Sequence, residues 1–283
     1  MKTVEMLRRI FAVVCMAMVV LSIRAAGDVP ELKRAILMVY YGTSDDSVRA
    51  VSIDAMTERV RREFPEVEVR EAWTSRAAVD ALMRRSGQQR LLVRDALRQL
   101  KADGYNSIVV GCCELIEGND ARNVEQIVHD MQPMFFEINI TTPLLYTDDD
   151  CRRALEVLIN HAAPEADEQL VFVGHGKDGA YNEVYCLCDY ILQHEGHSNS
   201  HVGTIAGYPS LENVKQILRQ SGSRRVVLAP LIMIAAGHAT KDIFKTWREA
   251  LEAEGYSVRL VRHGVIEYEE IQQMIVKKVK NEE

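Results

Sequence analysis

From residue 34 onward the chain alternates short apolar runs with longer amphipathic stretches, and this alternation limits its fold more than any other feature. Short apolar runs rich in β-branched residues are typical of strands that are buried on both faces. The runs predicted as strands are 35–41, 67–72, 107–112, 137–141, 170–173, 201–206, 225–230 and 257–261. Helices are predicted over 46–63, 76–84, 91–103, 120–132, 149–163, 180–194, 211–220, 240–254 and 266–280. Strands and helices that alternate at this spacing predict an α/β fold of parallel sheets flanked by helices.

The two halves of the sequence resemble each other, which predicts two similar domains. Each half opens with an apolar strand that ends in a glycine turn, LMVYYGTS at 37–44 and LVFVGHGK at 170–177. In each half the third strand runs into a long loop, SIVVGCCELIEGND in the first and RVVLAPLIMIAAGHATKD in the second. We therefore expect two Rossmann-like domains, 27–145 and 146–283, each with a parallel four-stranded sheet, and a final helix able to pack back on the first domain. Because parallel sheets bind ligands beyond the carboxyl ends of their strands, the active-site cleft is expected between the domains.

Residues 1–26 have the organisation of a secretory signal peptide. Basic residues precede an apolar run of 14 residues at 10–23, and Ala25 and Ala26 supply small residues for cleavage. A bilayer span needs about 20 apolar residues, so this run is short for a membrane helix. We expect export to the periplasm or another extracytoplasmic compartment, and Arg24 beside the cut leaves an uncleaved anchor as the alternative.

Charge and cysteine content argue against several classes of protein. The net charge is −7, and removal of residues 1–26 takes away four basic residues and one acidic residue, which leaves −10. Such a chain is poorly suited to bind nucleic acid or an anionic membrane surface. The cysteines after residue 26 are Cys112, Cys113, Cys151, Cys186 and Cys188. An odd number cannot all pair within one chain and their spacing is not that of a zinc ribbon, so most are expected to be small buried side chains.

The segment VFVGHGKDG at 171–179 contains the spacing of a dinucleotide-binding loop, with glycines at 174, 176 and 179. A dinucleotide site also needs an acidic residue at the end of the next strand. Glu195 precedes the strand predicted at 201–206, and Ala206 stands at its end. The sequence therefore disfavours NAD or flavin binding. The glycines then need another explanation.

Two histidines and one glutamate follow strands at the predicted cleft. His175 lies at the end of one strand, His238 in the loop after another, and Glu114 directly after the strand at 107–112. An imidazole accepts protons or binds a metal near neutral pH, and a carboxylate beside an apolar strand is costly unless it is solvated, paired or coordinating. These three residues are candidates for a two-histidine, one-carboxylate site for a divalent transition metal. Glu117 and Asp120 are expected to be solvated loop residues or acids at the start of a helix.

Five motifs, taken in order, resemble those of a known enzyme family. They are YYGTSDDS, WTS, GHG, GYP and PLIMIAAGHA. In this order and spacing, over residues 34–275, the chain resembles the anaerobic-type sirohydrochlorin cobaltochelatases, the CbiK-type class II chelatases. The resemblance implies a bilobal α/β fold and the ATP-independent insertion of a divalent metal into a tetrapyrrole held in the cleft, as in cobalamin biosynthesis. It also implies another explanation of the glycines around His175: they would give a flat ligand access to the end of the strand.

The resemblance also implies roles for individual residues. The histidine of GHG, His175, is expected to accept a proton and to bind the metal, and His238 is expected to be a metal ligand. Glu114 stands where the family usually has a histidine and becomes a ligand or second proton acceptor, while Ala206 replaces a glutamate of the family. Tyr41, at the position in the first half that His175 holds in the second, and Thr43 are candidates for contact with the tetrapyrrole.

The metal expected as substrate is Co²⁺, with Fe²⁺ or Ni²⁺ as alternatives, and neither ATP nor NAD is expected as a cofactor. The expected partner is a small tetrapyrrole, with no membrane partner beyond export, and self-association into a homo-oligomer is left open. A second hypothesis is a non-catalytic extracytoplasmic protein that binds haem, another tetrapyrrole or a metal on a chelatase scaffold.

Overall fold

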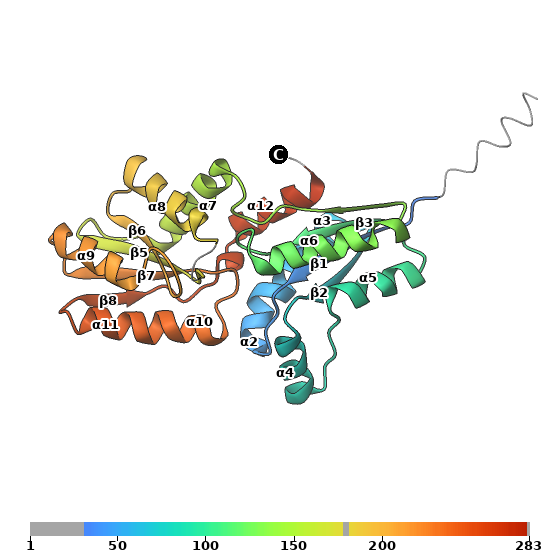
Figure 1. The fold of residues 1–283 in the computed structure, drawn as a ribbon, viewed down its shortest axis with the longest axis horizontal. Coiled ribbons are helices and arrows are strands. Elements are labelled where there is room, and N and C mark those ends of the chain that lie inside the picture. Colours follow the sequence, from blue (N-terminus) through green and yellow to red (C-terminus); the bar gives the residue numbers. More distant parts are fainter. Residues whose placement is uncertain (1–30, 178–180, 282–283) are drawn as a thin grey trace, which may run out of the picture. The chain divides into compact units, whose positions relative to one another are not determined.

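The computed structural model describes residues 31–177 and 181–281, in which the chain forms two four-stranded parallel sheets with helices packed on both faces (Figure 1). The side chains at positions 238 and 239 are outside the described set.

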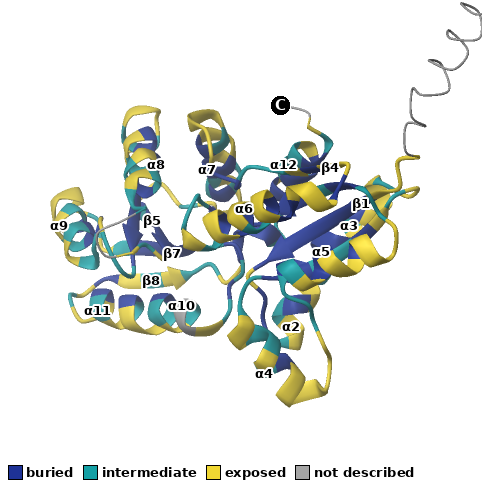
Figure 2. Cartoon of the chain, turned by 45° about the vertical axis from the view of Figure 1, so that its right-hand side comes forward, coloured by how far each residue is buried: buried dark blue, intermediate teal, exposed yellow. Residues whose placement is uncertain are grey.

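The first sheet is built from the first half of the chain. Its strands are β1 (Arg34–Tyr40), β2 (Glu68–Trp73), β3 (Ser107–Cys112) and β4 (Glu137–Ile140), all parallel, in the order β2-β1-β3-β4. The helical elements are α2 (Asp46–Arg49), the π-helix η1 (Ala50–Asp54), α3 (Ala55–Glu63), α4 (Arg76–Ser86), α5 (Val93–Ala102), α6 (Asn119–Met131) and the 3-10 turn η2 (Gln132–Met134). Residues 35–40 of the inner strand β1 are all buried, because helices cover both faces of the sheet (Figure 2).

The second sheet repeats this topology. Its strands are β5 (Glu168–Gly174), β6 (Ser200–Thr204), β7 (Arg225–Leu231) and β8 (Ser257–Leu260), all parallel, in the order β6-β5-β7-β8. The helical elements are α7 (Asp148–Ala162), α8 (Glu183–His194), α9 (Leu211–Ser221), α10 (Gly237–Lys241), the π-helix η3 (Asp242–Trp247), α11 (Arg248–Glu252), the 3-10 turn η4 (Val265–Glu267) and α12 (Glu269–Lys280). In both sheets the first strand of the half lies between the second and the third, so the predicted fold class is confirmed.

The predicted strands are all present, and the main differences are in two helices. The helix predicted over 46–63 contains the π-helical turn of η1, and the one predicted over 240–254 starts at Gly237 and contains η3. The spacing of apolar residues does not distinguish a single turn of π-helix from α-helix, because the two differ by only one residue per hydrogen bond.

One hydrophobic core joins the two halves. Met38 of β1, Phe172 of β5 and Ile275 of α12 belong to the same buried cluster, while the outer face of each sheet has a cluster of its own. The last helix, α12, packs against β3, α3 and α7. Lys278 anchors it through hydrogen bonds from Nζ to Asp150 Oδ2 (2.8 Å) and Thr142 Oγ1 (2.9 Å). The segment that contains the predicted domain boundary at 145/146 is therefore hydrogen-bonded to α12. The boundary itself remains a prediction.

The sequence also led to expectations about the N-terminal segment, about membrane-spanning helices and about the cysteines. The predicted signal peptide at 1–26 lies outside the described residues, and within the described part of the chain no helix has the length and apolarity needed to cross a bilayer. Four of the five cysteines after residue 26 are buried and all five are free thiols, in agreement with their expected role as small buried side chains. Cys186 is the exception, with partial exposure.

Candidate active site

Loops that follow the carboxyl ends of strands from both sheets line one cavity of about 780 Å³. Its lining includes residues of 41–44, 113–116 and 118–121 from the first half and of 175–177 and 232–234 from the second. This is the location expected for a ligand in parallel α/β sheets, where strand ends converge. The volume is in the range of sites that hold a small organic molecule.

The structure places Tyr41, Thr43, Glu114 and His175 on the lining of this cavity. His238 belongs to α10, whose first residue, Gly237, also lines the cavity. The side chain of His238 is outside the described set, so its predicted role as a metal ligand stays a prediction. Among the side chains that the structure does describe, no group of three His, Cys, Asp or Glu residues is arranged to hold a metal ion.

His175 follows β5 and is held in one tautomer. Its Nδ1 lies 2.8 Å from the carbonyl oxygen of Gly176, an acceptor, so Nδ1 carries the hydrogen and donates it. The other ring nitrogen, Nε2, is then left with its lone pair, which is the form that accepts a proton or binds a metal. The backbone of His175 is also fixed, because its carbonyl oxygen accepts a hydrogen bond from Ala206 N at 2.9 Å.

The glycines on either side of His175 pack closely against other parts of the protein. A Cβ on Gly174 would collide with the ring of Tyr185, and one on Gly176 would lie 2.6 Å from Cβ of Thr204. Gly176 also has φ +65°, in the left-handed region that other residues avoid. Both glycines are therefore required by close packing of the protein on itself. Gly176 also lines the cavity, and the expectation that the glycines give a flat ligand access to the strand end remains a prediction. Gly179 lies outside the described residues.

Glu114 follows β3 and carries a buried carboxylate oxygen on the cavity wall. Its backbone oxygen accepts a hydrogen bond from Leu144 N at 3.0 Å, but its carboxylate oxygen Oε1 is buried and has no hydrogen-bond partner among the described residues. Burial, followed by the negative charge of Asp120, raises the pKa of Glu114 to about 8. The carboxyl is thus mostly protonated at neutral pH and titrates close to it. Such a group is suited to exchange protons or to meet a cation.

Asp120 is an acid in the first turn of α6, in agreement with one of its two expected roles, but it is not a fully solvated side chain. It lines the cavity and is half-buried, and burial raises its pKa while the charge of His175 lowers it. Asp120 thus interacts electrostatically with both Glu114 and His175. The only signal in the sequence was its place after a strand-end loop. Glu117 agrees with the expectation of a solvated loop residue, since it lies before α6 and its half-exposed side chain pairs with Arg122 at 3.2 Å.

Tyr41 and Thr43 differ in what they offer a ligand. Tyr41 is 51% exposed although it lies on the cavity wall, so its ring is available for stacking. Thr43 is only 7% exposed, and its hydroxyl oxygen already accepts a hydrogen bond from Asp45 N at 3.1 Å. Tyr41 is therefore the stronger candidate for contact with a flat macrocycle.

The comparisons with known proteins cover almost the whole described chain. A family model described as cobalt chelatase (CbiK) matches residues 34–282. The sirohydrochlorin cobaltochelatase CbiKC of Nitratidesulfovibrio vulgaris is 29% identical over 264 residues, which cover 88% of this chain and 90% of that protein. The sirohydrochlorin cobaltochelatase of Salmonella typhimurium is 25% identical over 250 residues, which cover 87% of this chain and 94% of that protein.

Two solved structures share the fold. SirB from Bacillus subtilis, solved with Fe³⁺, superposes with a TM-score of 0.64 at 15% identity and covers 89% of this chain and 96% of its own. CbiX, described as the terminal enzyme for biosynthesis of sirohaem in denitrifying bacteria, gives a TM-score of 0.53 at 16% identity, with 88% of this chain and 99% of its own covered. At these identities the likeness concerns the fold.

Proposed function

Because this chain belongs to the cobalt chelatase (CbiK) family, we propose that it inserts a divalent metal, Co²⁺, into sirohydrochlorin or a closely related tetrapyrrole without the use of ATP. The observation that carries this proposal is the cavity that brings Glu114 from one sheet and His175 from the other to a common wall. Both curated relatives are named sirohydrochlorin cobaltochelatases, which supports cobalt as the metal and sirohydrochlorin as the macrocycle. Fe²⁺ and Ni²⁺ are alternatives that the experiment below compares.

The residues of the cavity supply what metal insertion needs. When a divalent ion enters the macrocycle, two pyrrole N–H protons leave, and two N–H bonds are exchanged for bonds to the metal without oxidation or reduction. His175 accepts one proton at Nε2, because Nδ1 already donates to the protein backbone. Glu114 takes the second proton in its ionised form. Its pKa of about 8 lets it hold that proton and release it to solvent near neutral pH.

In the proposed reaction, His238 binds the metal ion and delivers it to the macrocycle. Its position in α10, next to a lining residue of the cavity, supports this role. Imidazole and carboxylate ligands suit Co²⁺, Fe²⁺ and Ni²⁺ alike, so the donor set is compatible with each of the three ions.

We also propose that residues 1–26 direct export and that the enzyme acts outside the cytoplasm. The basic start, the apolar run and the two alanines support this. The mass of the protein recovered from the cell envelope tests it. A mature chain that begins near Gly27 is expected, and a full-length chain in the cytoplasmic fraction would contradict export.

The proposed reaction is tested by mixing the purified protein with sirohydrochlorin and Co²⁺, Fe²⁺ or Ni²⁺ and following the visible spectrum of the macrocycle. Faster metallation than in the uncatalysed mixture is expected, with Co²⁺ giving the largest acceleration. His175→Ala should lower the rate by about 10²- to 10⁴-fold. Lys277→Ala, which replaces an exposed lysine of α12 outside the cavity, serves as the control. No acceleration with any of the three metals would refute the proposal, and haem binding without turnover would favour a non-catalytic binder.

A further inference from the structure

Lys177 lies on the cavity wall two residues after His175, and its backbone is held by a side-chain clamp. The amide oxygen of Asn182 accepts a hydrogen bond from Lys177 N at 3.1 Å, and the amide nitrogen of Asn182 donates to Lys177 O at 2.6 Å. Asn182 is itself packed against the next loop, since a Cβ on Gly207 would lie 2.6 Å from its Oδ1. The position of Lys177 at the cavity is therefore fixed by the fold.

Tyr181 presents its ring to two cations at this place. The Lys177 ammonium lies 5.4 Å and the Arg122 guanidinium 5.0 Å from the ring centre, within the range of cation–π contact. Tyr181 lines the cavity and has φ +59°, a left-handed conformation that costs a residue with a side chain on the order of 1 kcal/mol. Strain of this kind persists only where surrounding contacts enforce it, and it is frequent at binding sites.

The two cations are poorly neutralised by the protein. Over the described residues, no carboxylate lies within ion-pair distance of the Lys177 ammonium. Among the residues that the structure describes, Arg122 forms an ion pair with Glu117, and both of these side chains are about half exposed, so the pair is weak and open to exchange. The chain as a whole is acidic, with a net charge of −7. Unpaired positive charge at the wall of a ligand cavity in such a chain indicates an anionic group on the ligand.

The geometry points to Lys177 as the binding site for a peripheral carboxylate of the macrocycle, with Tyr181 and Arg122 as its support. This inference rests on the proposed chelatase function. Sirohydrochlorin carries its carboxylates on the rim and its metal-binding nitrogens at the centre. Two residues of extended chain span at most about 7 Å, so a macrocycle centred on His175 has its rim within reach of the Lys177 side chain. The contact would fix how the ring is rotated in the cavity and select carboxylated macrocycles over esterified ones.

The inference is tested by measuring the binding of metal-free sirohydrochlorin and of its methyl ester, both in the same mild detergent. Lys177→Ala should weaken binding of the acid by about tenfold and leave binding of the ester unchanged. Lys177→Arg should restore most of the affinity for the acid, and Asn182→Ala should weaken it to a smaller degree because the backbone clamp is lost. The control Lys277→Ala should bind both compounds like the unsubstituted protein.

The outcomes separate this inference from the proposed function. If the unsubstituted protein binds the acid and Lys177→Ala binds it equally well, the carboxylate site is wrong and the chelatase proposal stands. The carboxylate site is also wrong if Lys177→Ala weakens binding of the acid and the ester equally, because the lysine then supports the loop and does not recognise charge. If the unsubstituted protein binds neither compound, the proposed function and the carboxylate site both fail.

Discussion

Glu168 and Glu114 are glutamates at opposite ends of strands, and they differ in whether other residues pair with their carboxylates and in the direction in which their pKa is shifted. Glu168 is the first residue of β5 and is only 3% exposed, whereas Glu114 follows the last residue of β3 and faces the cavity. Contacts of the carboxylate with Arg259 are the main cause that lowers the pKa of Glu168, while burial raises the pKa of Glu114 to about 8.

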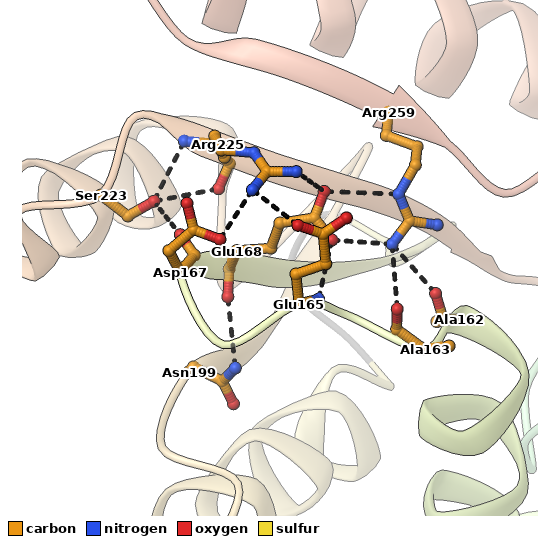
Figure 3. Close-up of polar contacts among 9 residues, drawn as sticks. All are labelled: Ala162, Ala163, Glu165, Asp167, Glu168, Asn199, Ser223, Arg225 and Arg259. Carbon is orange, nitrogen blue, oxygen red and sulfur yellow. Dashed lines mark hydrogen bonds and ion pairs between the residues drawn. The ribbon is translucent and has the colours of Figure 1, made fainter.

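The carboxylate of Glu168 is fully satisfied (Figure 3). It accepts a hydrogen bond from Arg259 Nη2 at 2.8 Å and one from the backbone nitrogen of Glu165 at 2.9 Å, and Arg225 lies 3.5 Å away. Arg225 in turn bonds to Glu165 and Asp167. Charge at this end of the sheet is thus paired within the protein, which is the arrangement expected of a structural site.

The cavity end of the sheets has the opposite arrangement. The carboxylate oxygen Oε1 of Glu114 has no hydrogen-bond partner among the described residues, and Asp120 adds a second carboxylate nearby. The Lys177 ammonium has no acidic partner among the described residues. Groups left unsatisfied in this way cost stability and are retained where a ligand completes them. The contrast between the two ends therefore separates residues that hold the fold from residues that meet the substrate.

Among substitutions of the two glutamates and their neighbours, the largest effect is expected from Glu114→Gln. The amide cannot take up a proton, so the rate of metallation should fall by about 10²- to 10³-fold, while the free energy of unfolding stays the same or rises. Initial rates and urea denaturation measure the two quantities. If Glu114→Gln loses stability and retains its rate of metallation, Glu114 has a structural role like that of Glu168, and the contrast between the two glutamates is wrong.

Glu168→Gln should give the reverse pattern. The guanidinium groups of Arg259 and Arg225 lose their shared buried charge, and the free energy of unfolding should fall by about 2–3 kcal/mol with the rate of the folded protein unchanged. Glu165→Gln, at an exposed carboxylate of the same network, is the matched control and should cost well below 1 kcal/mol. Loss of activity in folded Glu168→Gln protein would contradict this prediction.

The two glutamates should also give the stability of the protein opposite dependence on pH. The folded-state pKa of Glu168 is lowered, so its contribution is complete above the ordinary value of 4.5 and is lost as the pH falls through its folded pKa. The folded-state pKa of Glu114 is raised, so its favourable effect is complete below 4.5 and is lost as the pH rises toward 8.

Urea denaturation of the two variants across this range measures the effect. The stability difference between the unsubstituted protein and Glu168→Gln should narrow below pH 4.5, and Glu114→Gln should gain relative stability, on the order of 1–2 kcal/mol, between pH 4.5 and 8. Parallel curves for the three proteins would show that neither carboxyl has a shifted pKa.

The smallest effect is expected from Asp120→Asn. Its negative charge contributes to the raised pKa of Glu114, so its removal should lower that pKa by about half a unit to one unit. If ionised Glu114 is the proton acceptor, the pH at which the metallation rate rises should shift downward by the same amount. Asp95→Asn, on an exposed surface of α5, is the control and should leave the profile unchanged. If the pH dependence of the metallation rate is the same in Asp120→Asn, then the charge of Asp120 does not influence the pKa of Glu114.

The sequence predicted the fold and the family because both depend on repeated local patterns. The alternation of apolar runs and amphipathic stretches identified all eight strands, and the ordered motifs identified the chelatase family that the comparisons confirm. The predicted site residues Tyr41, Thr43, Glu114 and His175 line one cavity, while their chemical roles and the role of His238 remain predictions.

What the sequence could not supply depends on contacts between distant residues. The atoms that require Gly174 and Gly176 to be glycines come from Tyr185 and Thr204, which lie on other elements. Asp120 looked like an ordinary acid at a helix start until the fold placed it beside Glu114 and His175. The clamp from Asn182 to Lys177 is formed by side-chain hydrogen bonds that no periodicity reveals.

The sequence alone thus determined which segments become strands, how they repeat and which histidine ends the first strand of the second half, because these follow from local hydrophobic patterns and short motifs. Only the tertiary structure decided which carboxyl groups are paired and which are left unsatisfied. Burial and hydrogen bonding are set by neighbours far away in the chain. The same residue type, glutamate, therefore stabilises the fold at position 168, whereas at position 114 the carboxylate oxygen Oε1 is buried without a hydrogen-bond partner from the described residues.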